Sequence, residues 1–361
     1  LTIDPNIQFF IEEELIRQFR KVKSKKAIGI MIEVKTGAVI GLASIPRFNP
    51  NVYSRSKPEN WREPAIQDIY EPGSTFKIIT AAAYLENGGK KEEIFDTENG
   101  KYKIQGTSKT LRDHKKFGKL SMQEVIINSS NIGTYKIAKK IGPKRLFNMV
   151  KRFGFGNRTG VNFPSEAFGI LRSPSKWSKL SLASISIGQE IGVSPLQMLM
   201  PVAALANKGI MCSPKIVRSI KKFNKKFQEN ITCDGKRVVS EGTANELIRI
   251  MGKVVSEGTG KNAGLKSYKT GGKTGTAQKM VAGQKYYSDV DFVMSFVGFA
   301  PLRNPKLALI IIFDGGKLKN ESWGSTIAAP VWRRIILRTL RYLRVPPDNA
   351  KIMETKFRKE L

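Results

Sequence analysis

A serine and a lysine three residues apart, Ser74 and Lys77, stand at the start of an apolar run and directly after a Pro72-Gly73 break. Proline and glycine end the structure that precedes them, so a helix is predicted to begin near Ser74. Residues three apart are neighbours on a helix, which places both side chains on one face. The unpaired N–H groups and positive potential of a helix N-terminus also favour an oxyanion beside the serine. The pattern is typical of a serine nucleophile that works without histidine.

The same S-x-x-K spacing occurs at three other serines, none of which has this context. Ser54 lies in a polar stretch with no helical period. Ser173 is followed by proline, which disfavours helical geometry at the serine itself. Ser219 lies in a strand-like run, where residues three apart point to opposite faces. We therefore expect Ser74 to be the nucleophile.

A second motif follows at Ser129 and Asn131, which form the only S-x-N sequence in the chain. It lies between expected helices at 121–127 and 132–140, and a junction there would aim two polar side chains at one point. Taken alone, these residues are more simply helix caps. Their order after the S-x-x-K motif favours a shared site instead.

The third motif, K-T-G, occurs at Lys35, Lys269 and Lys273. The copy at Lys35 lies between two apolar runs and is most simply a hairpin turn. The copy at Lys269 is followed by a second glycine and is expected to lead into a strand that starts at Lys273. We favour the copy at Lys273, because the strand continues through it and Gly275 adds no bulk that would block a substrate backbone.

These motifs, in this order, resemble the S-x-x-K, S-x-N and K-T-G set of penicillin-binding proteins and class A β-lactamases. The chain is similar to the transpeptidase domain of a class B penicillin-binding protein over almost its whole length. Its Glu-Pro-Gly-Ser-Thr and Phe-Gly-Phe-Gly segments look most like the division-type branch, while the elongation and sporulation branches stay open. The matching blocks are residues 1–4, 70–77, 128–133, 153–160, 186–189, 194–197, 273–276, 296–301 and 328–331.

The resemblance implies a serine D,D-transpeptidase that cross-links peptidoglycan and is a target of β-lactam antibiotics. Ser74 would attack the carbonyl between the two terminal D-alanines of a stem peptide, and an amine of a second stem would then take the acyl group. Lys77 is the base in reach. A free lysine has a pKa of about 10.4, but burial and the charge of Lys273 would lower the pKa of Lys77. Ser129 would relay a proton to the leaving amine.

The remaining motif residues are expected to bind the substrate. Asn131 would hydrogen-bond the substrate amide and hold the base in place. Lys273 would supply a cation for the terminal carboxylate, with Thr274 and Thr276 as hydroxyl partners. Backbone N–H groups of Ser74 and Thr276 would form the oxyanion hole, which is often worth roughly 3 kcal/mol per donor.

Two departures from the family pattern lie near these motifs. Relatives commonly have glycine after Gly188-Gln189, where this chain has Glu190. They often have Arg-Asn-Arg ahead of the nucleophile segment, where this chain has Trp-Arg-Glu-Pro at 61–64. Neither departure changes the core chemistry. Glu190 would add negative charge and bulk near the site, and both departures are placed to alter the access of substrates or inhibitors.

Two other functions share part of this chemistry. A β-lactamase or D,D-carboxypeptidase is acylated in the same way but passes the acyl group to water. Class A β-lactamases need a deacylating glutamate in an E-x-x-L-N-like loop, and none stands between Ser129 and Lys273. A non-catalytic β-lactam sensor would be acylated once and would then signal. The sequence holds no signalling segment, although an excised domain would have lost one.

The predicted fold is α+β and β-lactamase/transpeptidase-like, with an antiparallel sheet flanked by helices. We expect one penicillin-binding transpeptidase domain over residues 1–361, with a helix-rich subdomain at about 86–205. An amphipathic helix is predicted at the start of the chain, where apolar residues recur at helical spacing: Ile7, Phe10, Ile11, Leu15 and Phe19. The other expected elements are a hairpin at 28–44, strands near 274–281, 291–299 and 306–313, and a closing helix near 330–343.

Composition narrows the remaining function classes. The formal charge is +32, but Lys and Arg are spread along the chain without a helix-turn-helix or aromatic-interleaved pattern, so nucleic acid is not an expected partner. A lesser alternative is that the basic surface is attracted to anionic lipids and to the pyrophosphate of lipid-linked precursors. The one histidine, His114, lies in an expected polar loop and is given a structural or surface role. No metal and no cofactor are expected, because histidine and cysteine are scarce and nucleotide-binding motifs are absent.

The chain contains no run of eighteen apolar residues and no signal sequence, and it begins at Leu1 rather than methionine. We therefore expect an excised piece whose relatives carry a membrane anchor and a further domain ahead of the catalytic part. The resemblance implies a catalytic domain on the periplasmic or outer face of the cytoplasmic membrane. It also implies a membrane-bound glycosyltransferase as partner.

The two cysteines, Cys212 and Cys233, lie in β-like segments at 210–220 and 227–237 that would pair as a long hairpin. In an oxidising compartment, a disulfide would close a loop of about 20 residues and contribute on the order of 3 kcal/mol. The alternative, which we favour from the sequence, is a small buried residue at Cys212 and a free thiol at Cys233.

Overall fold

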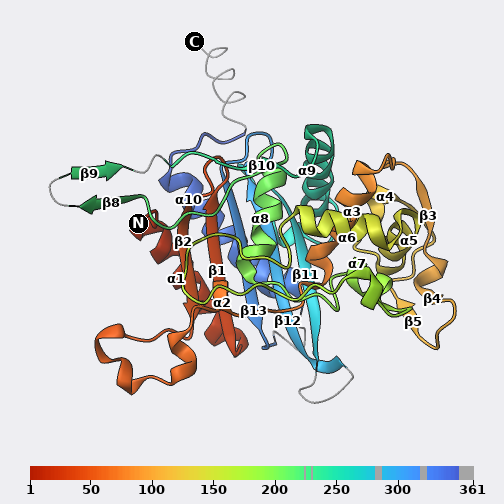
Figure 1. Cartoon of the computed structure of the whole chain (residues 1–361), viewed down its shortest axis with the longest axis horizontal. Helices are drawn as coiled ribbons and strands as arrows, with labels where there is room; N and C mark the ends of the chain where they lie inside the picture. Colours follow the sequence, from red (N-terminus) through yellow and green to blue (C-terminus); the bar gives the residue numbers. More distant parts are fainter. Residues whose placement is uncertain (223–224, 229–230, 281–286, 318–322, 349–361) are drawn as a thin grey trace, which may run out of the picture.

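The computed structural model describes residues 1–222, 225–228, 231–280, 287–317 and 323–348. Its centre is a five-stranded antiparallel sheet in the order β11-β12-β13-β1-β2, with helices on both faces and a helical region beyond the β11 edge (Figure 1). The strands of this sheet are β1 (Lys26–Glu33), β2 (Val39–Ile45), β11 (Gly271–Met280), β12 (Tyr287–Ala300) and β13 (Leu307–Asp314). The predicted α+β class, with an antiparallel sheet flanked by helices, is confirmed.

Alternation along the central strands creates two cores, one on each face of the sheet. In β1, Ile28 and Ile30 belong to the core under α8, whereas Ala27 and Met31 belong to the core under α1 and α10. Strand β13 is apolar at nearly every position and buried on both sides. A continuous apolar run is what a strand covered on both faces requires, because successive side chains point to opposite faces.

The remaining elements form the two helical layers on the sheet, the helical region beyond β11 and several short hairpins. The helices are α1 (Pro5–Val22), α2 (Pro64–Gln67), α3 (Lys77–Glu86), α4 (Met122–Ile127), α5 (Asn131–Ile141), α6 (Pro143–Arg152), α7 (Ser181–Ser186), α8 (Pro195–Ala206), α9 (Glu241–Ser256) and α10 (Gly324–Tyr342). The short strands are β3 (Ile94–Asp96), β4 (Lys101–Lys103), β5 (Thr110–Arg112), β6 (Lys119–Ser121), β7 (Ile210–Met211), β8 (Ser219–Lys222), β9 (Lys225–Gln228) and β10 (Lys236–Arg237). The 3₁₀ turns are η1 (Pro50–Arg55), η2 (Pro58–Trp61), η3 (Gly73–Phe76), η4 (Glu98–Gly100), η5 (Pro174–Lys176) and η6 (Lys261–Ala263).

Most of the predicted elements are confirmed, with shifts at their ends. The opening helix is α1, and its predicted apolar face is buried at Ile7, Ile11 and Leu15. The K-T-G copy at Lys35 lies in the turn between β1 and β2. The closing helix begins at Gly324, six residues earlier than expected, because Pro330 lies inside α10 rather than at its start. The last residue of the strand expected at 274–281 lies outside the described residues.

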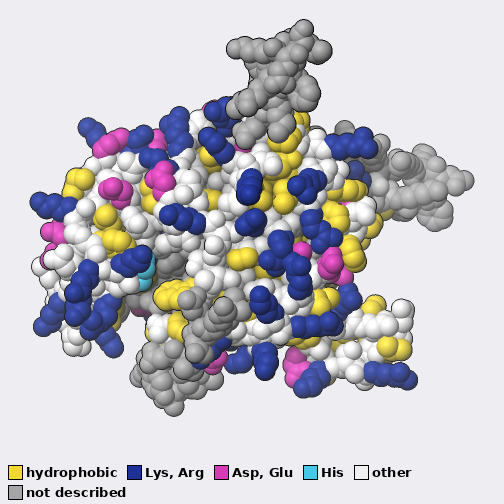
Figure 2. Space-filling view, turned by 180° about the vertical axis from the view of Figure 1, so that it is seen from behind, with side chains coloured by type: hydrophobic (Ala, Val, Ile, Leu, Met, Phe, Trp, Pro, Cys, Tyr) yellow, Lys and Arg dark blue, Asp and Glu magenta, His cyan; other side chains and the backbone are white. Residues whose placement is uncertain are grey.

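The surface is basic over much of its area. Figure 2 shows Lys and Arg side chains distributed over one whole face rather than gathered in one stripe, with few acidic side chains between them. Among the described residues, no helix is both long enough and apolar enough to cross a bilayer.

The favoured prediction, a small buried residue at Cys212 and a free thiol at Cys233, is wrong. The two cysteines form a disulfide. Strand β7 pairs with β10 beside the two cysteines, which brings their α-carbons to 4.9 Å. That separation lies within the range that a disulfide spans. Sequence alone does not give this register, because neither two-residue strand has a pattern of its own. Beyond the disulfide, β8 pairs with β9 as a hairpin that projects from the body (Figure 1).

Candidate active site

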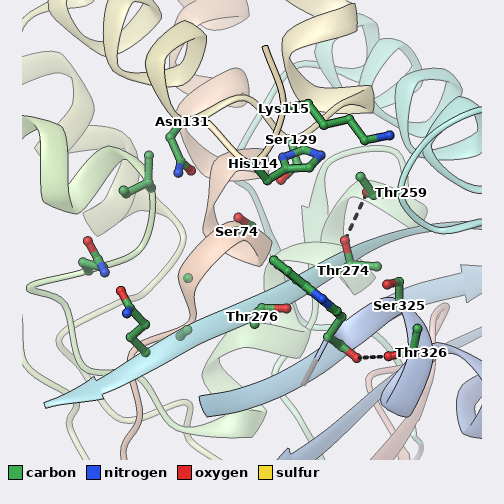
Figure 3. Close-up of a pocket in the computed structure, with 16 residues that line it drawn as sticks. Ser74, His114, Lys115, Ser129, Asn131, Thr259, Thr274, Thr276, Ser325 and Thr326 are labelled. Atoms are coloured by element: carbon green, nitrogen blue, oxygen red, sulfur yellow. Dashed lines mark hydrogen bonds between the residues drawn. The ribbon is translucent and has the colours of Figure 1, made fainter. Parts of the chain in front are cut away.

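A cleft of about 540 Å³ opens between β11 and the helical region (Figure 3). Its walls come from η3, the junction of α4 and α5, strand β11 and the first turn of α10. The expected site residues that line it are Ser74, Ser129, Asn131, Thr274 and Thr276. Segments separated by up to 253 positions in the sequence (326 − 73) therefore meet at one place.

Ser74 lies in the 3₁₀ turn η3, one turn ahead of the regular helix α3. The turn is sharp because Gly73 has a φ of +56°, a conformation that favours glycine. The Gly73 N–H donates to the Gly188 carbonyl at 2.9 Å, which ties the turn to the opposite wall. The Ser74 side chain points into the cleft (Figure 3) and makes no hydrogen bond to the described residues.

Lys77 is fully buried beneath the cleft and is held by three acceptors. Its Nζ donates to the Ser129 carbonyl at 2.6 Å, to Asn131 Oδ1 at 2.7 Å and, more weakly, to Ser129 Oγ at 3.3 Å. Burial lowers the pKa of Lys77 to about 7, and the charge of Asp113 opposes that shift. Near neutral pH this lysine is therefore populated in both its charged and its neutral form.

Ser129 connects the two buried lysines of the site. It has a φ of +59°, an unusual conformation for a residue other than glycine, which turns the chain between α4 and α5. Lys273 Nζ donates to Ser129 Oγ at 2.8 Å. Burial, and then the charge of Lys77, hold the pKa of Lys273 well below its usual value.

The K-T-G strand presents hydroxyl groups to the cleft and keeps its lysine beneath. Thr274 Oγ1 bonds Thr259 Oγ1 at 3.1 Å (Figure 3), and Thr276 Oγ1 accepts the Gly324 N–H at 3.0 Å. The Thr276 hydroxyl donates to none of the described residues, so its proton is available to an anion in the cleft. Lys273 is fully buried and is not part of the lining, so its effect on a bound carboxylate would pass through its charge and through Ser129.

The structure gives a reason for glycine at position 275 in addition to the predicted access for a substrate backbone. A Cβ built there would lie 2.3 Å from Ser295 Oγ, 2.9 Å from Thr75 Cγ2 and 3.2 Å from the Pro72 carbonyl oxygen. Thr75 belongs to the turn η3, Pro72 directly precedes it, and none of the three residues lines the cleft. The glycine therefore lets η3 pack directly on β11, which fixes Ser74 against the strand.

The competing motif copies lie away from the cleft. None of Ser54, Ser173, Ser219, Lys35 or Lys269 is among its lining residues. Within the described part of the chain, the three motif copies that we favoured are the ones that converge.

Sequence reasoning missed several residues that shape the site. His114 lines the cleft beside Ser129 (Figure 3), and burial together with the charge of Lys77 lowers its pKa. The predicted polar loop around His114 is present, but it borders the cleft. A structural or surface role therefore does not fully describe this histidine. Asp113 and Thr259 were also missed. One sequence gives no signal for them, because their spacing from the three motifs carries no local pattern.

Glu190 lies behind the cleft wall rather than in it. Its carboxylate accepts a hydrogen bond from Ser181 at 2.7 Å and forms an ion pair with Arg172. Its N–H donates to Glu71 Oε1 at 2.9 Å, just ahead of the turn η3. The neighbouring Gln189 lines the cleft. The charge and bulk of Glu190 therefore lie behind the cleft wall, where its contacts hold the wall in place.

Comparison with known proteins agrees with this geometry. The family profile described as "Penicillin binding protein transpeptidase domain" matches residues 27–337. Stage V sporulation protein D of Bacillus subtilis is 34% identical over 360 residues, which is 98% of this chain and 55% of that protein. A probable peptidoglycan D,D-transpeptidase PenA of Neisseria flavescens is 31% identical over 97% of this chain and 84% of that protein.

Solved structures agree as well. Penicillin-binding protein 3 from Mycobacterium tuberculosis, complexed with aztreonam, superposes with a TM-score of 0.88 at 29% identity, over 96% of this chain and 79% of that one. The chain spans about half the length of several curated relatives that it matches. With a family match over most of its length and the motif residues gathered in one cleft, the chain belongs to the penicillin-binding protein transpeptidase family, in its class B branch.

Proposed function

We propose that this domain is a serine D,D-transpeptidase that cross-links peptidoglycan stem peptides through an acyl-enzyme on Ser74. The observation that carries the proposal is the position of the Ser74 side chain in a cleft whose floor holds Lys77, bonded to both Ser129 and Asn131. A nucleophile, a base of lowered pKa and a hydroxyl relay are the groups that acyl transfer requires.

In the first half of the reaction, Ser74 Oγ attacks the carbonyl carbon between the terminal D-alanines. Neutral Lys77 takes the hydroxyl proton, and the carbonyl oxygen becomes an oxyanion beside the Ser74 N–H. Collapse of this intermediate breaks the peptide bond, and Ser129 passes a proton to the departing D-alanine amine. Lys273, bonded to Ser129, replaces the relayed proton. An ester on Ser74 and free D-alanine result.

In the second half, an amine of another stem peptide attacks the ester carbonyl. The same relay accepts the proton of the attacking amine and returns it to Ser74 Oγ as the ester bond breaks. Water in place of the amine would give hydrolysis, which is the reaction of the alternative β-lactamase or D,D-carboxypeptidase function. The outcome depends on which nucleophile reaches the ester.

Strand β11 provides the binding surface for the donor peptide. It is an edge strand of the five-stranded sheet, and an extended peptide would pair with its outer edge beside Thr274 and Thr276. Thr274 and Thr276 line the cleft beside that edge and would hold the terminal carboxylate. The Thr276 N–H would complete the oxyanion hole with that of Ser74.

The proposed setting is the outer face of the cytoplasmic membrane, with β-lactams as inhibitors and a membrane-bound glycosyltransferase as partner. Solved relatives hold aztreonam and ampicillin, which supports the assignment of β-lactams. The setting and the glycosyltransferase rest on the family resemblance.

One experiment separates the proposed function from its alternatives. The protein is incubated with a thioester analogue of the stem peptide, with and without an added D-amino acid, and the products are followed by mass spectrometry. A transfer product that contains the D-amino acid supports the transpeptidase. Fast hydrolysis unaffected by the acceptor indicates a carboxypeptidase or β-lactamase, and a single stoichiometric burst indicates a sensor.

A further inference from the structure

Asp113 occupies a position that none of the three motifs includes. It follows strand β5, and its backbone N–H donates to the Gly100 carbonyl at 3.1 Å. Its carboxylate faces the first turn of helix α5, where Oδ2 accepts the Ser130 hydroxyl at 2.6 Å and Oδ1 accepts the N–H groups of Asn131 and Ile132. A carboxylate from a separate segment thus caps the helix that carries the S-x-N motif.

The residue before Asp113 completes the arrangement. The Arg112 carbonyl accepts a hydrogen bond from Asn131 Nδ2 at 2.8 Å. The carboxamide of Asn131 is thereby oriented with its Nδ2 towards this segment and its Oδ1 towards Lys77, which donates at 2.7 Å. The Ser130 hydroxyl accepts the Gly133 N–H at 2.9 Å, so the same turn is fixed from inside as well.

We propose that Asp113 is a positioning residue of the acylation site, which fixes Asn131 against Lys77 and supplies the one negative charge that faces this lysine among the described residues. The inference rests on the proposed function, because it assigns Lys77 the role of base. Asp113 contacts neither the cleft nor the reacting atoms, so it acts through Asn131 and Lys77.

The electrostatic part of this role has a definite sign. The charged and titratable groups around Lys77 are Lys273 from β11 and Asp113 and His114 from the loop that follows β5. Burial lowers the pKa of Lys77, and Asp113 raises it. Loss of the negative charge would lower the pKa of Lys77 further and keep the lysine neutral to a lower pH. A purely structural cap would not produce this shift.

The test compares three variants with the wild type. Asp113→Asn keeps the shape of the side chain without its charge, and Asp113→Glu keeps the charge with a longer reach. Asp96→Asn is the matched control, because Asp96 also caps a backbone N–H in the helical region but lies outside the cleft. The rate of acylation by a fluorescent penicillin is measured from pH 5 to 9, and circular dichroism establishes folding.

For Asp113→Asn we expect the acid limb of the acylation rate against pH to shift to lower pH by at least about half a pH unit. We also expect the plateau rate to fall roughly tenfold or more, because Asn131 loses its fixed geometry. Asp113→Glu should keep the acid limb and lose plateau rate, and Asp96→Asn should match the wild type. An unchanged acid limb in Asp113→Asn, or a plateau within twofold of the wild type, overturns the proposal.

Two further outcomes are assigned in advance. If Asp113→Asn does not fold, Asp113→Glu decides: a lowered plateau with the wild-type acid limb supports the proposal, and a wild-type plateau overturns it. If the wild type itself takes up no penicillin on Ser74, the proposed function fails. If the wild type is acylated and the variants behave like it, only the role of Asp113 fails.

Discussion

Lys77 and Lys273 donate hydrogen bonds to the same atom, Ser129 Oγ, at 3.3 and 2.8 Å. Both lysines are fully buried, and burial lowers the pKa of each. Two buried ammonium groups that share one acceptor also repel each other, so the pair favours the loss of one proton. A hydroxyl between two such amines is well placed to pass that proton from one to the other.

Ser74 should be the acylated residue. Incubation with benzylpenicillin followed by peptide mapping should place the adduct on the peptide that holds Ser74, because its side chain is the one of the four S-x-x-K serines that lines the cleft. Ser74→Ala should show no adduct, and Ser173→Ala should be acylated like the wild type. An adduct on Ser54, Ser173 or Ser219 would overturn the assignment.

Lys273, and not Lys269, should control acylation. Lys273→Ala removes the hydrogen bond to Ser129 and leaves a void beneath the K-T-G strand, so the acylation rate should fall by a factor of about 100 or more. Lys269→Ala is the matched control and should stay within a few-fold, because Lys269 lies outside the cleft. The rates can be measured with a chromogenic cephalosporin. The reverse ranking would contradict the assigned register of β11.

Acylation should depend on the protonation of Lys77. Its pKa of about 7 means that the ammonium form dominates below that pH and cannot accept the Ser74 proton. The rate should therefore rise through pH 7 and fall about tenfold for each unit below it. Stopped-flow acylation across pH 5 to 9 measures this limb. A rate that stays flat from pH 5 to 8 would show that Lys77 is not the base.

Gly275→Ala should displace the nucleophile turn. The added methyl would lie 2.3 Å from Ser295 Oγ and 2.9 Å from Thr75 Cγ2, so these side chains, or the backbone of η3 or β11, must shift. Overpacking of this kind costs about 1–3 kcal/mol, and the acylation rate should fall as well. Gly118→Ala is the control, because its Cβ would meet no atom within 4 Å. Thermal unfolding and acylation rates check both variants. A Gly275→Ala protein with wild-type stability would disprove the tight contact.

The disulfide should contribute to stability without affecting the chemistry. Cys212 and Cys233 are 21 residues apart, and closure of a loop of this size is worth on the order of 3 kcal/mol. The double variant Cys212→Ala/Cys233→Ala should unfold at a lower denaturant concentration and should be acylated at the wild-type rate. Thiol titration of the denatured, unreduced protein should find no free thiol. Two free thiols per chain would contradict the bridge.

The sequence predicted the parts of the fold and the site that have a local signal. The Pro-Gly break and the apolar run after it predict the role of Ser74, and the strand that continues through Lys273 predicts the role of that lysine. Strand β13 and helix α1 were visible as an apolar run and a helical period. Each of these signals lies within about a dozen neighbouring residues.

Features that depend on distant contacts could not be predicted in the same way. Asp113 reaches Asn131 across 18 positions only because β5 and the start of α5 come together in space. The need for glycine at position 275 also depends on a distant contact. Thr75, which a side chain there would meet, lies 200 positions earlier in the sequence (275 − 75). The disulfide depends on the pairing of two strands of two residues each, which have no recognisable pattern.

The order of strands in the sheet has a consequence for how the molecule is made. One edge of strand β1 pairs with β13. The partner strand begins 274 residues after β1 ends (307 − 33). At about 5–20 residues per second, synthesis takes on the order of ten seconds to a minute to bridge that gap. A hairpin of β1 and β2 that formed in this time would leave the isoleucine-rich β1 edge unpaired, and such edges tend to aggregate. The topology therefore favours a chain whose sheet forms only after β13 has been made.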